Sequence, residues 1–351
     1  MAVVSVITVA YGGEPWLEQC VASVLASGVD DLEIVLVDNG TDVDLRSLAS
    51  QDQRIRIVGH GENLGFAGGV NLGVARSSGE TVVLLNSDAL LTDGALPTLV
   101  AAATEPGAGI VGALIVLAED PGLVNSAGNP LHILGLSWAG GYGRATTTIA
   151  PRTSVASASG AGLALRRSLW DRLGGFHEAY FAYYEDMDLS WRCHLQGLPV
   201  TVLADAKVAH HYEFSRNALK MYLLERNRLL FLLTTFQRRT LAVIAPPLLG
   251  MEVALLAAAA SQGWGREKLR GWAWLIREHR QVRALRRRVQ AERLVDDAAL
   301  LGLLTDTFDT DQLTIPAWTA PLQSLLRLYW QLFRGLLGAG GAASSGRIAI
   351  D

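Results

Sequence analysis

Within its first 90 residues the chain alternates short β-branched runs with stretches of helical spacing, and this alternation restricts its fold more than any other feature. The short runs are apolar on both faces, as buried strands of a parallel sheet must be. Helices between parallel strands make βαβ units, so we predict a doubly wound α/β sheet. The predicted strands are residues 3–9, 33–37, 55–58 and 81–85, and the predicted helices are residues 15–25, 43–49 and 67–76.

Polar residues follow three of these strands at the point where each strand ends. Tyr11 follows the first, Asp38 the second, and Asn86 and Asp88 the fourth. Ligands of doubly wound sheets bind in a crevice outside the carboxyl ends of the strands. We therefore expect these four side chains to share one ligand crevice.

Composition narrows the class of protein further. Half of the 351 residues are apolar, enough for a large α/β domain with a smaller appendage. A net charge of -4 argues against a general nucleic-acid binder. Cys20 and Cys193 are too few for a disulfide framework or a zinc site, so a reducing compartment fits best. The first strand follows Met1 closely without a cleavage site, so we expect no signal peptide and a cytoplasmic location.

The Asn86-Ser87-Asp88 turn and the pair His210-His211 are candidate metal ligands. Carboxylate and amide oxygens suit Mg²⁺ or Mn²⁺, which completes its shell with water and phosphate oxygens. One neutral imidazole could join Asp88, but adjacent histidines rarely point at the same site. The alternatives are an ordinary turn or helix N-cap for the first motif and a structural histidine for the second.

The glycine-rich segment 63–71 opens a predicted helix and is a candidate donor-binding element through Asn63, Gly68 and Asn71. Small residues let the backbone approach a ligand, and a helix N-terminus favours an anion. The alternative is a tight turn with close helix packing. The spacing fits neither a P-loop nor a dinucleotide-binding loop.

Three carboxylates crowd the start of a predicted helix at residues 189–195, on Glu185, Asp186 and Asp188. Their mutual repulsion should raise at least one pKa and prepare a general base, for which we choose Asp186, with Glu185 beside it. The alternative is a charged N-cap that interacts with the helix dipole.

The composition changes after about residue 213, where a helical region begins. Residues 241–260 are nearly as long and apolar as a membrane span, but Pro246, Pro247 and Glu252 favour a helix that enters the membrane surface without crossing it. Residues 266–293 then carry ten Lys/Arg against three Glu, a pattern that attracts anionic lipid. We predict domains at 1–213 and 214–337, with an amphipathic stretch at 322–337 and a flexible tail at 338–351.

Several motifs together resemble the family 2 inverting glycosyltransferases, and within them the rhamnosyltransferase branch. The resemblance covers roughly residues 3–230. Its motifs are Val6 to Tyr11, Val37 to Gly40, Asn63 to Asn71, Leu85 to Asp88, Gly174 to Phe176, Tyr184 to Arg192 and Glu225 to Arg228.

The resemblance implies a GT-A fold and single displacement with inversion at the anomeric carbon. It places Tyr11 and Asp38 on the nucleoside of a dTDP- or UDP-sugar, and Asn86 and Asp88 at the family's Asp-x-Asp metal motif, where Asn replaces the first Asp. Asp186 matches the family's base. Trp191 and Asp188 would line the acceptor side, and Arg226 and Arg228 would face the diphosphate or lipid headgroups.

Three other functions are alternatives that fit the sequence less well. A noncatalytic nucleotide-sugar-binding scaffold should lose Asp88 or Asp186, and both are present. A nucleotidyltransferase needs a basic residue near Tyr11, and none is there. A processive synthase needs several clear membrane spans, which the sequence lacks. A polyprenyl-linked glycan acceptor would suit a protein peripheral on the inner face of the plasma membrane. A soluble glycan acceptor would instead leave the carboxyl-terminal region to homodimer formation.

Overall fold

The computed structural model describes residues 4–211, 217–308 and 320–338. Its residues group into two compact units, 1–130 with 138–217 and 131–137 with 218–351. The predicted boundary at 213 kept residues 131–137 in the first domain, whereas the structure groups them with the second. The reason is that β8 (Leu131–His132) pairs with β12 (Leu304–Thr305). Apart from Gly338, which ends α13, the predicted tail lies outside the described residues.

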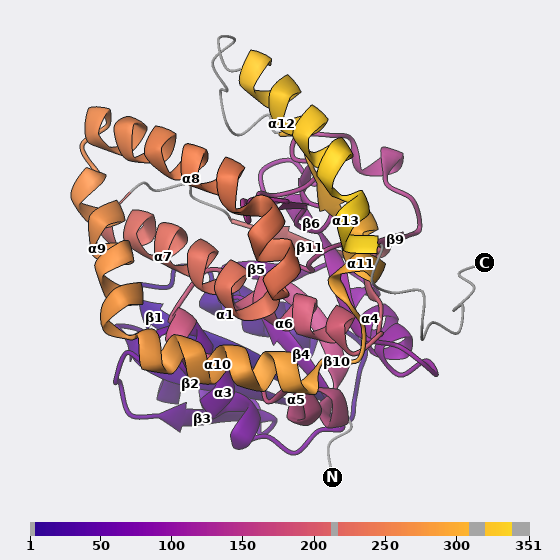
Figure 1. The fold of residues 1–351 in the computed structure, drawn as a ribbon. Helices are drawn as coiled ribbons and strands as arrows, with labels where there is room; N and C mark the ends of the chain where they lie inside the picture. The colour runs from indigo at the N-terminus through magenta and orange to yellow at the C-terminus, as the bar shows by residue number, and fades with distance from the viewer. Residues whose placement is uncertain (1–3, 212–216, 309–319, 339–351) are drawn as a thin grey trace. The chain divides into compact units, whose positions relative to one another are not determined.

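The first unit is built on a mixed sheet in the order β3-β2-β1-β4-β10-β6-β11-β5 (Figure 1). The four predicted strands are confirmed and run parallel to one another. They are β1 (Val4–Gly12), β2 (Leu32–Thr41), β3 (Ile55–Gly59) and β4 (Thr81–Leu85). The remaining strands are β5 (Ala89–Leu91), β6 (Ile110–Leu117) and β11 (Val200–His210), with β7 (Val124–Ser126) beside β6 and β9 (Arg152–Ser154) beside β11.

One central strand departs from the expected parallel sheet. β10 (Gly162–Arg166) runs antiparallel between β4 and β6, with Gly162 opposite Leu85. A parallel strand needs a crossover connection, usually a helix, whereas β10 is entered from a short turn at the carboxyl end of β4. The turn at residues 159–161 is therefore held at the sheet edge where the site was predicted.

Helices cover both faces of this sheet. Alternate residues of β1 separate the two cores: Val4 and Val6 pack in one, and Ile7 and Val9 pack in the other. The first core takes in α1 (Leu17–Leu25), α2 (Leu45–Ala49) and α4 (Ala95–Ala103). The second takes in α3 (Gly65–Ala75), α5 (Arg167–Leu173) and α6 (Glu185–Leu195). The three layers explain why the strands are apolar on both faces.

The second unit is mainly helical (Figure 1). Its helix α8 runs without a break through Pro246 and Pro247. Among the described residues, α8 alone is long and apolar enough to cross a membrane. The helices are α7 (Ala218–Thr235), α8 (Arg238–Ser261), α9 (Gly265–Arg277), α10 (His279–Glu292), α11 (Asp297–Leu300), α12 (Ala320–Phe333) and α13 (Gly335–Gly338).

Glu252, the carboxylate within apolar α8, belongs to a buried ion network. It pairs with Arg228 of α7 and with Lys268 of α9, and both cations also pair with Glu225. Arg226 is buried with its guanidinium 4.6 Å from the centroid of Trp274. These contacts correct the prediction that Arg226 and Arg228 face a diphosphate or lipid headgroups, because both side chains are used inside the helical unit.

Candidate active site

The pairing of β5 with β11 brings Asp88 and His210 together. His210 Nε2 lies 3.1 Å from Asp88 Oδ1, and the His211 backbone N–H donates to the Asp88 carbonyl at 2.9 Å. The other ring nitrogen of His210 lies 3.4 Å from Asn125 Oδ1. An imidazole held by a carbonyl oxygen at Nδ1 presents its Nε2 lone pair, as metal-binding histidines do.

These residues fit a divalent cation. The side-chain oxygen of Asn86 is buried and has no hydrogen-bond partner among the described residues, which leaves its lone pairs for a ligand. No cluster of three or more His, Cys, Asp or Glu suited to a metal occurs in the described ranges. A cation here would therefore draw on Asp88, His210, Asn86 and oxygens from water or substrate, as Mg²⁺ and Mn²⁺ commonly do.

His211 is turned to other partners. Its ring stacks on Trp16 with centroids 3.5 Å apart, and its Nδ1 lies 3.7 Å from Glu119 Oε1. His210 is the last residue of β11 and His211 follows it, so the two side chains leave the strand end in different directions. The prediction that His211 could bind the metal is therefore wrong, and His210 is the remaining candidate.

Glu14 is a site residue that the sequence analysis missed. Its carboxylate accepts the Tyr11 backbone N–H at 3.0 Å, and burial, helped by the charge of Asp88, raises its pKa. The only sequence signal was an acidic residue soon after β1. Its position places a further carboxyl group beside the candidate cation site.

Tyr11 of β1 and Asp38 of β2 lie close to two glycines, Gly40 of β2 and Gly61 just after β3. A Cβ added at Gly40 would come within 3.8 Å of the Tyr11 ring, and one added at Gly61 would come within 3.8 Å of both Asp38 carboxylate oxygens. Tyr11 is 57% exposed. An open aromatic ring, a carboxylate and bare backbone can receive a nucleoside by stacking and hydrogen bonding.

The glycine-rich segment 63–71 forms a tight turn and packs closely at the start of α3, which was the alternative to donor binding. Asn63 accepts the Gly65 N–H at 2.9 Å, and a Cβ on Gly68 would come 2.8 Å from Leu64 Cβ. Asn71 donates to the Phe176 carbonyl at 2.9 Å and accepts its N–H at 3.0 Å. These contacts give Asn63, Gly68 and Asn71 a structural role in fixing α3, and that they also bind the donor stays a prediction.

Asp186 lies in the first turn of α6, which begins at Glu185, four residues before the predicted start. Its Oδ2 accepts the Gly160 N–H at 3.1 Å and its Oδ1 the Met187 N–H at 2.7 Å. Burial raises the pKa of Asp186 despite these bonds. A partly exposed carboxylate with a raised pKa is suited to accept a proton.

The 159–161 turn joins this base to the candidate cation site. The Asn86 N–H donates to the Ala161 carbonyl at 3.2 Å, while Gly160 holds Asp186. Adjacent residues of a single turn thus fix both groups. The loop before α6 is strained, since Phe181, Tyr183 and Tyr184 all have positive φ, and such strain clusters at functional sites.

Glu185 differs from its neighbour in accessibility. It is only 6% exposed, and burial followed by the charge of Asp186 raises its pKa well above the ordinary range. The neutral form is therefore favoured at Glu185. Asp186 is the carboxylate of the pair that a substrate can reach.

The prediction that Asp188 and Trp191 line the acceptor side is wrong, because both side chains are buried. Asp188 accepts from Arg192 Nε at 2.7 Å and lies 3.1 Å from His177 Nδ1. Burial alone would raise its pKa, but the charges of Arg192 and His177 hold it well below the usual range. Trp191, three residues further along α6, shares the same buried face.

Asp188→Asn is expected to lower the free energy of unfolding by about 3–5 kcal/mol, because it leaves the buried Arg192 without its charge partner. Denaturant titration of both proteins measures the difference. A loss below about 1 kcal/mol would contradict a structural role for this carboxylate.

The turnover number is expected to fall as the pH falls through the raised pKa of Asp186, since only the charged carboxylate accepts a proton. The fall should begin above the ordinary aspartate value of 3.8. A pH profile of kcat at saturating substrate measures it. A flat profile down to that ordinary value would show that no such base acts.

An exposed aromatic ring beside a carboxylate, a candidate cation site and a carboxylate with a raised pKa lie at one sheet edge, as in a nucleotide-dependent transferase. The sequence profile of glycosyl transferase family 2 matches residues 5–174, and the chain belongs to that family. It is therefore a glycosyltransferase, as predicted.

The chain is similar in sequence to two relatives, each over part of its length. The chain is 30% identical over 239 residues to N-acetylglucosaminyl-diphospho-decaprenol L-rhamnosyltransferase of Mycobacterium tuberculosis, covering 60% of this chain and 76% of the relative. It is 31% identical over 156 residues to the O-antigen biosynthesis protein RfbC of Myxococcus xanthus, covering 42% and 12%.

Both structural neighbours confirm the predicted GT-A fold. GalNAc-T7, solved with UDP, GalNAc and Mn²⁺, matches with a TM-score of 0.56 at 13% identity over 69% of this chain and 50% of its own. The mannosyltransferase PcManGT from Pyrobaculum calidifontis, solved with GDP-Man and Mn²⁺, matches with a TM-score of 0.51 at 19% identity, over 83% and 85%.

Proposed function

We propose that this glycosyltransferase moves a sugar, rhamnose in our first choice, from a nucleotide-diphosphate sugar to a hydroxyl of a lipid-linked glycan, with inversion. The observation that carries the proposal is the 159–161 turn, which fixes Asp186 through Gly160 and Asn86 through Ala161. Group transfer needs an acceptor oxygen placed in line, a base for its proton and charge stabilisation of the leaving group.

Asp186 is the base in this proposal. Its carboxylate takes the proton of the acceptor hydroxyl as that oxygen attacks the anomeric carbon, and the bond from that carbon to the nucleoside diphosphate breaks. The backbone bonds from Gly160 and Met187 fix the carboxylate in one orientation. Partial burial raises its pKa and therefore its basicity.

Asp88, His210 and Asn86 would hold Mg²⁺ or Mn²⁺. When bound, the ion supplies positive charge next to the departing diphosphate. The pairing of β5 with β11 holds His210 beside Asp88, which directly precedes β5. Mn²⁺ in both structural neighbours supports the choice of a divalent cation.

The substrates rest on relatives and on residue chemistry. The rhamnosyltransferase relative, named for an N-acetylglucosaminyl-diphospho-decaprenol substrate, supports rhamnose and a polyprenyl-diphosphate-linked acceptor. Tyr11 and Asp38 would take the nucleoside of a dTDP- or UDP-sugar. A soluble glycan acceptor is the other outcome, with homodimer formation expected in that case.

A lipid-linked acceptor calls for a protein at the cytoplasmic face of the plasma membrane. α8 exposes Leu249 and Val253 at 68% and 70%, and α12 exposes Leu325 and Leu332. The buried Glu252 faces ion partners within its own unit, so one side of α8 is polar and the other is free for lipid. These surfaces support peripheral attachment.

The full-length protein should release nucleoside diphosphate from one class of sugar nucleotide when supplied with a polyprenyl-diphosphate N-acetylglucosamine acceptor and Mn²⁺. A panel of UDP-, GDP- and dTDP-sugars, each with and without acceptor and metal, measures this release. A folded protein that binds a donor but releases nothing under any condition would contradict this acceptor, and no release with a soluble glycan either would make it the noncatalytic scaffold.

A further inference from the structure

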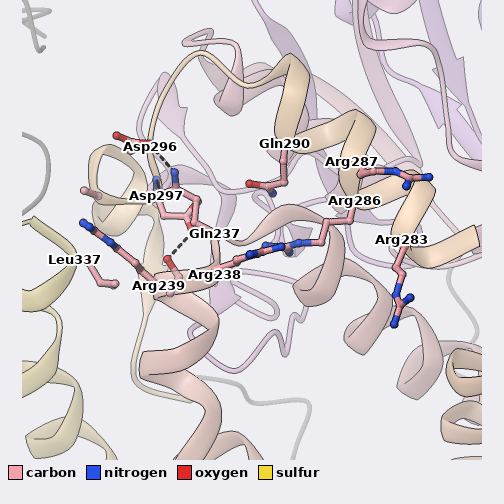
Figure 2. Close-up of a pocket in the computed structure, with 12 residues that line it drawn as sticks. Gln237, Arg238, Arg239, Arg283, Arg286, Arg287, Gln290, Asp296, Asp297 and Leu337 are labelled. Atoms are coloured by element: carbon pink, nitrogen blue, oxygen red, sulfur yellow. Dashed lines mark hydrogen bonds between the residues drawn. The ribbon is translucent and has the colours of Figure 1, made fainter. Parts of the chain in front are cut away.

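An arginine-rich cavity of about 780 Å³ lies in the helical unit and has no part in the transferase site (Figure 2). Its walls come from the start of α8, one face of α10, the start of α11, and Leu337 of α13. The cationic side chains that line it are Arg238, Arg239, Arg283, Arg286 and Arg287.

Most of this positive charge is not neutralised by the protein. In the described part of the chain, no carboxylate lies within 4.0 Å of the guanidinium of Arg238, Arg239, Arg283 or Arg287. Arg286 donates to the Phe236 carbonyl at 2.8 Å. Arg238, Arg239, Arg283 and Arg287 are exposed, so water screens part of their mutual repulsion, and a bound anion would reduce the rest.

The two carboxylates of the cavity wall are already used. Asp297 Oδ2 accepts the Gln237 backbone N–H at 2.7 Å, and its Oδ1 pairs with Arg293 at 2.5 Å. Asp296 accepts from the Gln237 side chain at 2.6 Å. These bonds brace the junction between α7 and α8. Neither carboxylate forms an ion pair with one of the five cavity arginines, although the charge of Asp297 offsets part of that of Arg286.

Arg286 and Arg238 lie with their guanidinium groups close together in Figure 2, one from α10 and the other from the first residue of α8. Burial, and after it the charge of Arg238, lower the pKa of Arg286. Two distant chain segments thus direct positive charge into one hollow. The N-terminus of α8 adds a partial positive charge to the same wall.

We infer that this cavity binds phosphate groups. Arginine forks match phosphate oxygens with paired hydrogen bonds, and several around one hollow favour a doubly charged group over a carboxylate. The phosphate can come from an anionic phospholipid headgroup or from a free phosphate compound. Leu294 and Leu336 are 75% and 59% exposed near these wall residues in the sequence, which favours the lipid source.

The test compares two double variants of the full-length protein that lose the same charge. Arg238→Gln/Arg287→Gln removes one cavity arginine from each segment, whereas Arg280→Gln/Arg288→Gln removes two exposed arginines of α10 outside the cavity. Binding is measured by calorimetry with inorganic diphosphate and by co-sedimentation with vesicles of phosphatidylglycerol or phosphatidylcholine. EDTA is present throughout, to suppress metal-dependent binding at the transferase site.

The cavity variant is expected to weaken binding by tenfold or more, while the control keeps wild-type affinity. Loss of binding to phosphatidylglycerol vesicles assigns the site to headgroups, and loss of diphosphate binding alone assigns it to a free phosphate compound. Equal binding by the two variants in both assays would overturn the inference. Because no donor or acceptor sugar is present, this result is independent of the transferase proposal.

Discussion

Asp186→Asn should lower the turnover number by about 10²–10⁴-fold and leave the dissociation constant of the donor nearly unchanged. The amide has the size of the carboxylate but cannot take the proton of the acceptor hydroxyl. Because Asp186 is fixed by backbone N–H groups of Gly160 and Met187, the loop should keep most of its geometry. Steady-state kinetics and donor titration measure the two quantities separately.

Asp171→Asn is the matched control for this change, since Asp171 is an exposed carboxylate on α5. It should keep both turnover and donor affinity. Near-normal turnover in Asp186→Asn would remove this residue from the role of base. Equal losses in donor affinity and turnover would assign it to donor binding instead.

Asp88→Ala should remove most of the gain in donor affinity that Mn²⁺ provides. His210→Gln should weaken this gain by about 10–100-fold, the range seen when groups around a metal are altered. Both expectations follow from the 3.1 Å approach of His210 Nε2 to Asp88 Oδ1. Donor titrations with and without Mn²⁺ give the ratio directly.

His211→Gln supplies the control, because the neighbouring ring stacks on Trp16. It should leave the ratio of affinities with and without Mn²⁺ near the wild-type value. An unchanged ratio in Asp88→Ala would exclude Asp88 from the cation site. A loss in His211→Gln as large as that in His210→Gln would contradict the assignment to His210.

The order of the first strands and helices could be predicted from the sequence because each carries a local signal. β1, β2, β3 and β4 are runs of buried β-branched residues, and their spacing is set by the helices between them. β10 lacked such a signal. Its antiparallel direction depends on where the turn at 159–161 enters the sheet, which is a property of the assembled fold.

Some residues of the candidate site could likewise be predicted from the sequence, and others could not. Tyr11, Asp38 and Asp88 follow strands and could be placed at one edge from sequence alone. Asp188 and Arg192 stand four residues apart on a helix, and that spacing was a usable signal of an internal ion pair. The role of His177 was not visible, because its contact with Asp188 arises only when the preceding loop folds back on α6.

Asn71 shows a further limit of sequence patterns. Its motif resembled a ligand-binding turn, yet its amide bonds the backbone of Phe176, far along the chain. The arginine cavity shows the reverse case. The basic residues in 266–293 could be predicted to attract lipid. That some of them line one cavity with Arg238 depends on how the helices pack.

The most direct test of the account follows the sugar itself from donor to product. The full-length protein is given an isotope-labelled sugar nucleotide of the class that it cleaves, Mn²⁺ and polyprenyl-diphosphate N-acetylglucosamine, and the lipid product is analysed by NMR. The label is expected to enter the lipid with inverted anomeric configuration. Product with retained configuration, or no labelled product from a protein that binds the donor, would contradict it.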